Sequence, residues 1–368
     1  MYKAQLRNKQ ILRTKTYLHQ EEAFYSFRIA LLCLFSPLES RKMSRDSSVR
    51  YSENFIYNSR GVKLFTCTWL PDSTKIKALV FFCHGYGVEC SEYMKGTAIR
   101  LARAGFAVFG LDYEGHGKSD GLQCYIKSFS NVVDDCVDYF KTIREREEYR
   151  EKARFLLGES MGGAVALRVH RKEPNDWNGA VLVAPMVKIA EEVKPPAIVI
   201  SILTKLCTVF PTWKIVPIRD IIDTGFKDPL KREEMRSSPY IYQDKPRLRS
   251  ALELMNASLD LEQRLNEVTL PFIVLHGEAD VVTDIEVSKT LYRTASSFDK
   301  TLKTYPSMWH ALLFGEPENN IDLVISDIVA WLNERSPDTE SNASSPTLLT
   351  HSHLSLIDHN TKKEDLQI

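Results

Sequence analysis

Residues 154–164 have the sequence R-F-L-L-G-E-S-M-G-G-A, in which a short apolar run leads through G-x-S-x-G into a helical pattern. When a strand turns sharply into a helix around such a serine, the turn lifts the hydroxyl above the sheet. Glycines are needed on both sides because a Cβ atom there would clash with the neighbouring element. The stretch therefore predicts a strand, a tight turn that presents Ser160 as a nucleophile, and a helix.

The sequence around this stretch alternates between strand and helix patterns. Continuous apolar runs are typical of strands that are covered on both faces, and helical periodicity separates them. An antiparallel hairpin is expected first, and repeated βαβ crossovers follow it. We therefore expect an α/β fold with a mostly parallel sheet and helices on both faces. The expected strands are 52–57, 64–69, 78–83, 107–111, 154–157, 180–184, 272–275 and 301–305, and the expected helices are 92–104, 132–146, 161–171, 285–294 and 321–333.

The alternation stops between residues 184 and 271, and this part is expected to form an inserted helical cap. Its helical segments are punctuated by Pro195, Pro196, Pro211, Pro217, Pro229, Pro239 and Pro246. Both ends differ from the middle. The N-terminal segment has basic residues before any acidic one and could be a targeting segment or an unstructured extension with Met43 as the true start. The C-terminal segment is rich in small polar residues and predicts a disordered tail. The expected divisions are an extension at 1–49, the first part of the core at 50–185, the cap at 186–268, the second part of the core at 269–335 and a tail at 336–368.

A serine hydroxyl is a poor nucleophile without a base, and an acid must orient that base. In this kind of fold the three follow in the order serine, acid, histidine. Asp280 follows a predicted strand and lies in a loop at the carboxyl end of the sheet. Its competitors are Glu278 and Asp284, the latter better suited to capping the next helix. His310 follows the last predicted strand. Ser160, Asp280 and His310 are therefore the predicted catalytic triad.

Acyl transfer passes through an oxyanion, which backbone N–H groups stabilise. One should come from the residue after the nucleophile and one from the loop after an earlier strand. Met161 is the first residue, and the loop 84–87, H-G-Y-G, offers the amide of Tyr86. A plain tight turn would explain the two glycines of this loop equally well, but its place in the chain favours an oxyanion hole.

The overall composition excludes several other classes of protein. The chain has 368 residues with 48 Lys and Arg against 48 Asp and Glu, so no excess of positive charge is available for nucleic acid. Its seven cysteines form no C-x-x-C pair, which argues against a zinc site or a disulfide framework and favours a reducing compartment. We expect no metal and no cofactor. Small-molecule or lipid esters are the expected partners.

The most apolar part of the predicted cap is residues 197–210, in which Lys205 is the only charged residue. On a helix, Ile198, Ile202 and Leu206 share one face. This face either packs against the main domain or forms part of a lid that meets lipid and binds substrate. We slightly favour contact with lipid and therefore expect peripheral contact with a membrane.

A series of motifs over about residues 50–335 resembles the monoacylglycerol lipase family of α/β hydrolases, especially its plant branch, which includes caffeoylshikimate esterase and lysophospholipase-like members. They are H-G-Y-G (84–87), G-H-G-K-S-D-G (115–121), G-E-S-M-G-G-A-V-A-L (158–167), A-V-L-V-A-P-M (180–186), D-K-P-R-L-R (244–249), H-G-E-A-D-V-V-T-D (276–284) and W-H-A-L-L-F-G-E-P (309–317). The resemblance implies a capped hydrolase with Ser160, Asp280 and His310 as its triad. Glu159 stands where animal members usually have histidine.

The resemblance also implies an activity. We expect a cofactor-independent serine hydrolase that cleaves esters of lipids, foremost monoacylglycerol, through an acyl-enzyme. A phenolic esterase of the caffeoylshikimate type and a lysophospholipase are the alternative enzymes. A hydrolase-fold ligand receptor is the alternative from another class, because this fold can keep an intact triad in a signalling protein. We expect a cytoplasmic location, and targeting to an organelle by residues 1–42 stays open.

Overall fold

The computed structural model describes residues 48–72, 75–188, 196–216 and 219–336. The chain divides into two units, Met1–Arg50 and Tyr51–Ile368, and the second unit begins within the first strand. The expected targeting segment and the expected tail at 336–368 lie outside the described residues, except for Ser336. None of the described helices is long and apolar enough to cross a membrane.

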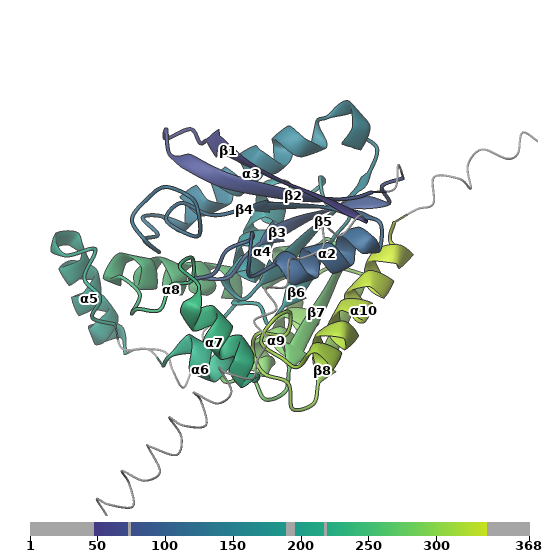
Figure 1. Ribbon diagram of the computed structural model, residues 1–368. Coiled ribbons are helices and arrows are strands. Elements are labelled where there is room, and N and C mark those ends of the chain that lie inside the picture. Colours follow the sequence, from purple (N-terminus) through teal and green to yellow (C-terminus); the bar gives the residue numbers. More distant parts are fainter. Residues whose placement is uncertain (1–47, 73–74, 189–195, 217–218, 337–368) are drawn as a thin grey trace, which may run out of the picture. The chain divides into compact units, whose positions relative to one another are not determined.

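The expected α/β fold is confirmed by an eight-stranded sheet in the order β1-β2-β4-β3-β5-β6-β7-β8 (Figure 1). Strand β2 runs antiparallel to β4, whereas β4, β3, β5, β6, β7 and β8 run parallel to one another. The carboxyl ends of these six strands therefore meet at one edge, where open α/β sheets build their sites. The strands are β1 (Val49–Tyr57), β2 (Lys63–Pro71), β3 (Ala78–Cys83), β4 (Phe106–Leu111), β5 (Ala153–Glu159), β6 (Gly179–Val183), β7 (Phe272–Gly277) and β8 (Lys300–Tyr305).

Helices cover both faces of the sheet. On one face, α3 (Phe129–Arg144) packs against α4 (Met161–Lys172), and α4 contacts β3 and β5. On the other face, α2 (Lys95–Arg103) contacts β4 and packs against α10 (Glu318–Glu334), as Figure 1 shows. Helix α9 (Ile285–Thr294) contacts β7 and β8. The central strands are thus buried on both sides, which explains their continuous apolar runs.

The chain between β6 and β7 contains helices α5 (Ala197–Val209), α6 (Ile221–Gly225), α7 (Pro229–Ser237) and α8 (Leu248–Glu262). Helix α8 packs against α3, α4 and α5, so it joins this segment to the sheet-covering helices. Two short 3-10 helices, Glu147–Tyr149 and Leu265–Glu267, complete the described elements.

The start of α2 differs from the expectation. A helix from residue 92 was predicted, but α2 begins at Lys95. The buried carboxylate of Glu89 accepts hydrogen bonds from the amides of Ser91, Glu92 and Tyr93. These amides are held in a turn around one side chain, so the regular helix starts only after them.

We expect replacement of Gly162 by alanine to lower the free energy of unfolding by about 3 kcal/mol or more, since relief of so severe a clash requires backbone movement. A Cβ atom on Gly162 would lie 1.7 Å from the carbonyl oxygen of Cys83. Gly96 occupies the same position in the first turn of α2, where a Cβ atom would meet only the flexible end of Arg100 at 3.2 Å. Gly96→Ala should therefore leave stability unchanged or raise it. Urea unfolding of both variants tests this difference, and equal effects would contradict it.

Candidate active site

Ser160 lies between the last residue of β5 and the first residue of α4. Its backbone has φ 53° and ψ −118°, a conformation that costs energy in any residue other than glycine. The surrounding chain holds it there. The amide of Ser160 donates to Val183 in β6 at 2.9 Å, and its carbonyl accepts from the amides of Gly163 and Met186 at 3.0 and 2.9 Å. The predicted sharp turn around Ser160 is thus present, with its half-buried side chain at the edge where the strands end.

Close packing around this turn explains the neighbouring glycines. A Cβ atom on Gly158 would lie 2.3 Å from the carbonyl oxygen of Gly162, and one on Gly163 would lie 2.5 Å from the Cβ atom of Pro185. Distances of this size leave no room for a methyl group. The glycines of G-x-S-x-G are therefore required by the contact of α4 with β5 and with the end of β3, and Gly163 is required by the contact with Pro185 after β6.

His310 and Asp280 form a directly bonded pair. Asp280 follows β7 and His310 follows β8, so adjacent parallel strands deliver both to the same edge of the sheet. The Nδ1 atom of His310 lies 2.7 Å from Oδ2 of Asp280. The other oxygen, Oδ1, accepts the amides of Val282 and Thr283 at 2.7 and 3.0 Å. The turn that holds Asp280 thus also fixes the direction of its bond to His310.

The local charges favour an ionised Asp280 beside a basic His310. Burial by itself would raise the pKa of Asp280, but the charge of His310 and hydrogen bonds from His276 and His310 hold that pKa well below its usual range. Burial would lower the pKa of His310, yet the charge and hydrogen bond of Asp280 raise it above its ordinary value. Such a pair can accept a proton on the imidazole and stabilise the resulting cation.

The two competing acids have other partners. Asp284 is the N-cap of α9, and its side chain accepts the amide of Glu286 at 2.9 Å. Glu278 is exposed and accepts the hydroxyl of Thr304 at 2.8 Å. The structure therefore brings Asp280, and neither competitor, into contact with His310.

His276 is a second histidine in contact with Asp280, and its place before a glycine at the end of a strand is typical of a histidine that fixes a loop by hydrogen bonding. Its Nε2 atom lies 3.2 Å from Oδ2 of Asp280 and 3.1 Å from the carbonyl oxygen of Thr283. Its Nδ1 atom lies 2.7 Å from the hydroxyl of Ser288 in α9. The only signal in the sequence was a histidine before glycine at the end of a strand. This ring ties β7, the Asp280 turn and α9 together.

The loop 84–87 passes directly beside Ser160. A Cβ atom on Gly85 would lie 3.6 Å from the Cβ atom of Ser160. The ring of His84 stacks on Tyr113 at a centroid distance of 3.8 Å, and its Nε2 atom accepts the amide of Tyr113. No described acceptor takes a hydrogen bond from the amide of Tyr86. The amide of Met161 is the first in α4, where helical geometry offers no acceptor. Both predicted oxyanion donors are therefore free of described partners.

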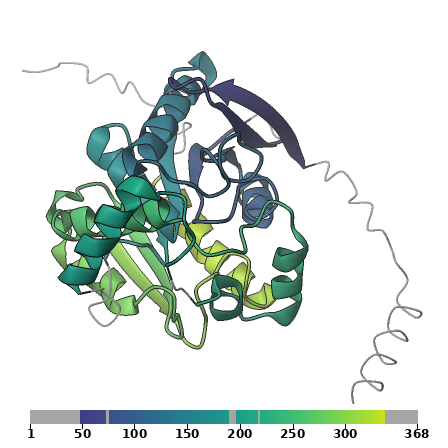
Figure 2. The same ribbon diagram turned by 90° about the vertical axis from the view of Figure 1, so that its left-hand side faces the viewer.

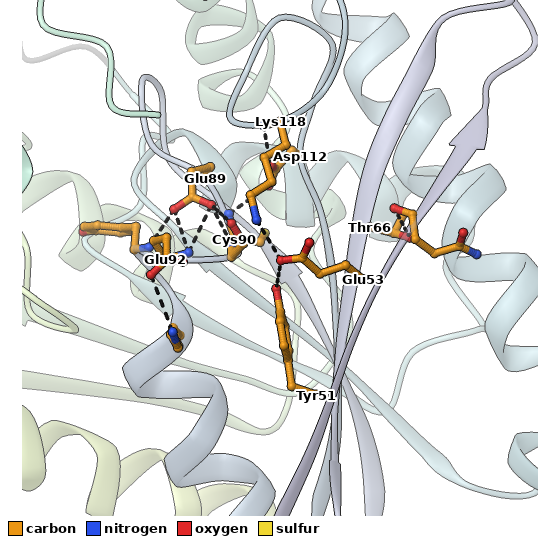
Figure 3. Close-up of polar contacts among 12 residues, drawn as sticks. Tyr51, Glu53, Thr66, Glu89, Cys90, Glu92, Asp112 and Lys118 are labelled. Atoms are coloured by element: carbon orange, nitrogen blue, oxygen red, sulfur yellow. Dashed lines mark hydrogen bonds and ion pairs between the residues drawn. The ribbon is translucent and has the colours of Figure 1, made fainter. Parts of the chain in front are cut away.

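A buried carboxylate network fixes the continuation of this loop (Figure 3). Glu89 holds the turn before α2, as described above. Asp112, at the end of β4, accepts the amides of Cys90 and Lys118 at 2.9 and 3.0 Å. Burial and the nearby Glu89 raise the pKa of Asp112 to about 7. The Lys118 side chain in turn binds Glu53 at 2.7 Å. The loop beside Ser160 is thus anchored to β1 and β4 rather than left free.

A pocket of about 180 Å³ adjoins this loop. Tyr86 and Gly87 line one side of it, and the segment between β6 and β7 supplies Ile222, Phe226 and Tyr242. Phe226 directly follows Gly225, where an added Cβ atom would lie 3.6 Å from the Cβ atom of His310. The pocket is therefore bounded by residues next to the histidine and next to the predicted oxyanion hole. A largely apolar cavity in this place can hold the acyl or alcohol part of an ester.

The predicted apolar face of α5 is only partly exposed. Ile198 and Ile202 are 68% and 58% exposed. Leu206 is half-buried and packs with Leu203 against Cys207, Leu248 and Leu252. The exposed stripe therefore continues to Val209, which is 67% exposed, rather than to Leu206. Sequence periodicity missed this because it does not show from which side α8 contacts the helix. Figure 1 shows α5 at the outer edge of its segment, and Figure 2 brings that edge toward the viewer. None of the three predicted residues lines the described pocket.

Comparison with known proteins identifies relatives along most of the chain. The caffeoylshikimate esterase of Arabidopsis thaliana is 36% identical over 288 residues, covering 78% of this chain and 86% of that protein. The human monoglyceride lipase is 30% identical over 311 residues, covering 84% of this chain and all of the human protein. A crystal structure of a soluble variant of the Saccharomyces cerevisiae monoglyceride lipase, in complex with a substrate analogue, has the same fold. It has a TM-score of 0.69 at 20% identity and covers 77% of this chain and 96% of that chain.

A family model described as serine aminopeptidase, S33, matches residues 74–318. This range runs from the start of the parallel strands to the start of α10 and includes Ser160, Asp280 and His310. The match and the relatives confirm the resemblance seen in the sequence motifs. The chain belongs to the S33 family of α/β hydrolases and is monoacylglycerol lipase-like within it.

Proposed function

We propose that this chain hydrolyses carboxylic esters of lipids, foremost monoacylglycerol to glycerol and fatty acid, with Ser160 as nucleophile, His310 as general base and acid, and Asp280 as the group that orients His310. The observation that carries the proposal is the 2.7 Å bond between His310 and Asp280 at the same sheet edge as the strained Ser160 turn. The named relatives, which include monoglyceride lipases, support the choice of substrate.

The reaction has two halves in this proposal. The Ser160 Oγ atom attacks the ester carbonyl carbon while His310 takes the hydroxyl proton. The amides of Tyr86 and Met161 stabilise the oxyanion. The bond to the alcohol then breaks, and His310 returns its proton to the leaving oxygen. Water then attacks the acyl carbonyl carbon while His310 takes a proton from it. His310 passes that proton to the Ser160 Oγ atom as the bond to the acyl group breaks, which releases the acid and restores Ser160. Asp280 stays ionised throughout and stabilises each imidazolium.

One alternative, a phenolic esterase, has support from specific observations. A phenolic ester substrate is favoured by the 36% identity to a caffeoylshikimate esterase and by the edge-to-face pair of Tyr86 and Tyr242, whose centroids lie 6.1 Å apart at the pocket. A phenolic ring could pack against such a pair.

A ligand receptor with this fold would react with an ester at most once. A panel of monoacylglycerol, lysophospholipid and phenolic esters, scored for released products over many turnovers, separates these readings. Fastest turnover of a phenolic ester would replace the lipid assignment.

We expect Ser160→Ala to abolish turnover and labelling by a fluorophosphonate probe while the protein stays folded, because only a half-buried hydroxyl is removed. His310→Ala should be comparably inactive. Asp280→Asn should lose on the order of 10³ to 10⁴ in kcat, since the amide holds the imidazole in the wrong tautomer. Asp284→Asn is the matched control and should retain activity with a slightly weaker helix cap. If Asp284→Asn lost its activity and Asp280→Asn kept it, the acid that orients His310 would be wrongly assigned.

We also propose that the exposed stripe of α5 contacts a membrane surface and that the protein is cytoplasmic and only peripherally bound there. Monoacylglycerols reside mainly in membranes and micelles, so a hydrolase must draw them out of lipid. Exposed Ile198, Ile202 and Val209 offer an apolar contact of the kind made by a helix that lies in the interface. Leu206 supports the stripe from behind by packing on α8.

We expect Ile202→Glu to weaken binding to liposomes and to slow hydrolysis of long-chain monoacylglycerol about tenfold, because it places a charge in the contact. Hydrolysis of a short, water-soluble ester should be unaffected. Ser201→Glu adds the same charge at an exposed position on the polar side of α5 and is the control. Equal loss on both esters with a lower melting temperature, or equal effects of the two variants, would argue against membrane contact.

A further inference from the structure

Glu159 is a buried acid directly beside the nucleophile for which the triad mechanism has no role. It is the last residue of β5, and only 2% of its surface is exposed. Neither of its carboxylate oxygens has a hydrogen-bond partner among the described residues. An ionisable group in this state is costly for the fold, because burial without partners disfavours its charge. A side chain that served only for packing at this position could be apolar and would not need a carboxyl group.

Two groups from other parts of the chain act on the Glu159 carboxyl. His310 comes from the turn after β8, and Tyr93 comes from the turn before α2. Tyr93 is 4% exposed, and its side chain favours the ionised form of the Glu159 carboxyl by lowering its pKa. Asp280 faces the same imidazole through its hydrogen bond to Nδ1. The imidazole of His310 is thus influenced by two buried carboxyl groups.

The two carboxyl groups differ in their surroundings. Asp280 accepts hydrogen bonds from two amides, a hydroxyl and His310, so it is ionised throughout the working pH range. Burial raises the pKa of Glu159 to about 7, against the opposing effects of the His310 charge and of Tyr93. Glu159 in turn adds to the effect of Asp280 in raising the pKa of His310. Near neutral pH, therefore, the charge of Glu159 varies whereas that of Asp280 does not.

We propose that Glu159 is a positioning residue that acts through His310, its carboxylate supplying a second negative charge that stabilises the imidazolium in each half of the reaction. This inference rests on the proposed hydrolase function. Full activity then requires Glu159 to be deprotonated, and its protonation lowers the rate by removing this second charge. The pair titrates together, so the acid side of the pH profile belongs to both groups.

Glu159→Gln tests the proposal because it removes the charge and keeps the shape. The acid limb of kcat/KM should move to lower pH by about one unit, since His310 loses a neighbour that raises its pKa. The plateau of kcat at high pH should fall about tenfold, which corresponds to one pKa unit of lost stabilisation. Glu278→Gln is the matched control. It changes the same charge at an exposed site in the Asp280 turn and should leave the profile in place.

Stability gives a readout that is independent of activity. A group whose pKa is raised on folding stabilises the fold fully below its unfolded pKa, and this contribution is lost as the pH rises through the folded value. For Glu159 the loss runs from about pH 4.5 to about 7. Glu159→Gln should therefore melt at a higher temperature relative to the parent at pH 8 than at pH 5. This comparison also shows whether the variant is folded.

Tyr93→Phe is the second variant and should act in the opposite direction. It removes a group that favours ionised Glu159, so the rise of activity to its plateau should move to higher pH. A pH profile of kcat/KM that is unchanged in both variants would overturn the role of Glu159. Continued turnover by Ser160→Ala would instead overturn the proposed function, so the two failures are distinguishable. Displacement of the acid limb in both variants in the same direction would likewise contradict the inference.

Discussion

The carbonyl oxygen of Cys83 and the α-carbon of Gly162 approach so closely that no methyl group fits between them. This contact brings the first turn of α4 against the end of β3. Because the loop 84–87 leaves β3 at this point, it has to pass beside Ser160. The same close packing holds the serine backbone at a positive φ. The strain is distributed over hydrogen bonds from β6 and the residues that follow it, so the site depends on the sheet rather than on a flexible loop.

Electrostatics around His310 follows from the same geometry. Parallel neighbours β7 and β8 present Asp280 and His310 at one edge, and β5 ends in Glu159, whose charge adds to that of Asp280 in raising the pKa of His310. Asp280 is surrounded by donors and remains charged, whereas Glu159 accepts no hydrogen bond from the described residues and is readily neutralised. Environment, and not residue type, therefore separates the behaviour of two carboxyl groups that act on one imidazole.

Much of this arrangement could be predicted from the sequence. The buried strands and the elbow around Ser160 depend on local patterns, and the loops that hold Asp280 and His310 follow from the order of those strands. The start of α2 could not be predicted, because the side chain of Glu89 captures amides that would otherwise begin the helix. The orientation of Leu206 depends on contacts with α8, which is distant in sequence. The proximity of Glu159 to His310 likewise arises only when β5 and β8 are placed in one sheet.

The segment with α5 to α8 leaves the sheet after β6 and returns before β7. These two strands still pair directly, from Ala180 with Phe272 to Val183 with Leu275. The order of strands at the edge where they end therefore does not depend on the length of the intervening chain. The entropic cost of closing a longer loop also grows only slowly with its length. Evolution could exchange or lengthen this insertion while the chemistry stayed in place. The same sheet could in this way serve both aliphatic and aromatic esters, with changes only in the inserted residues that surround the alcohol and the acyl chain.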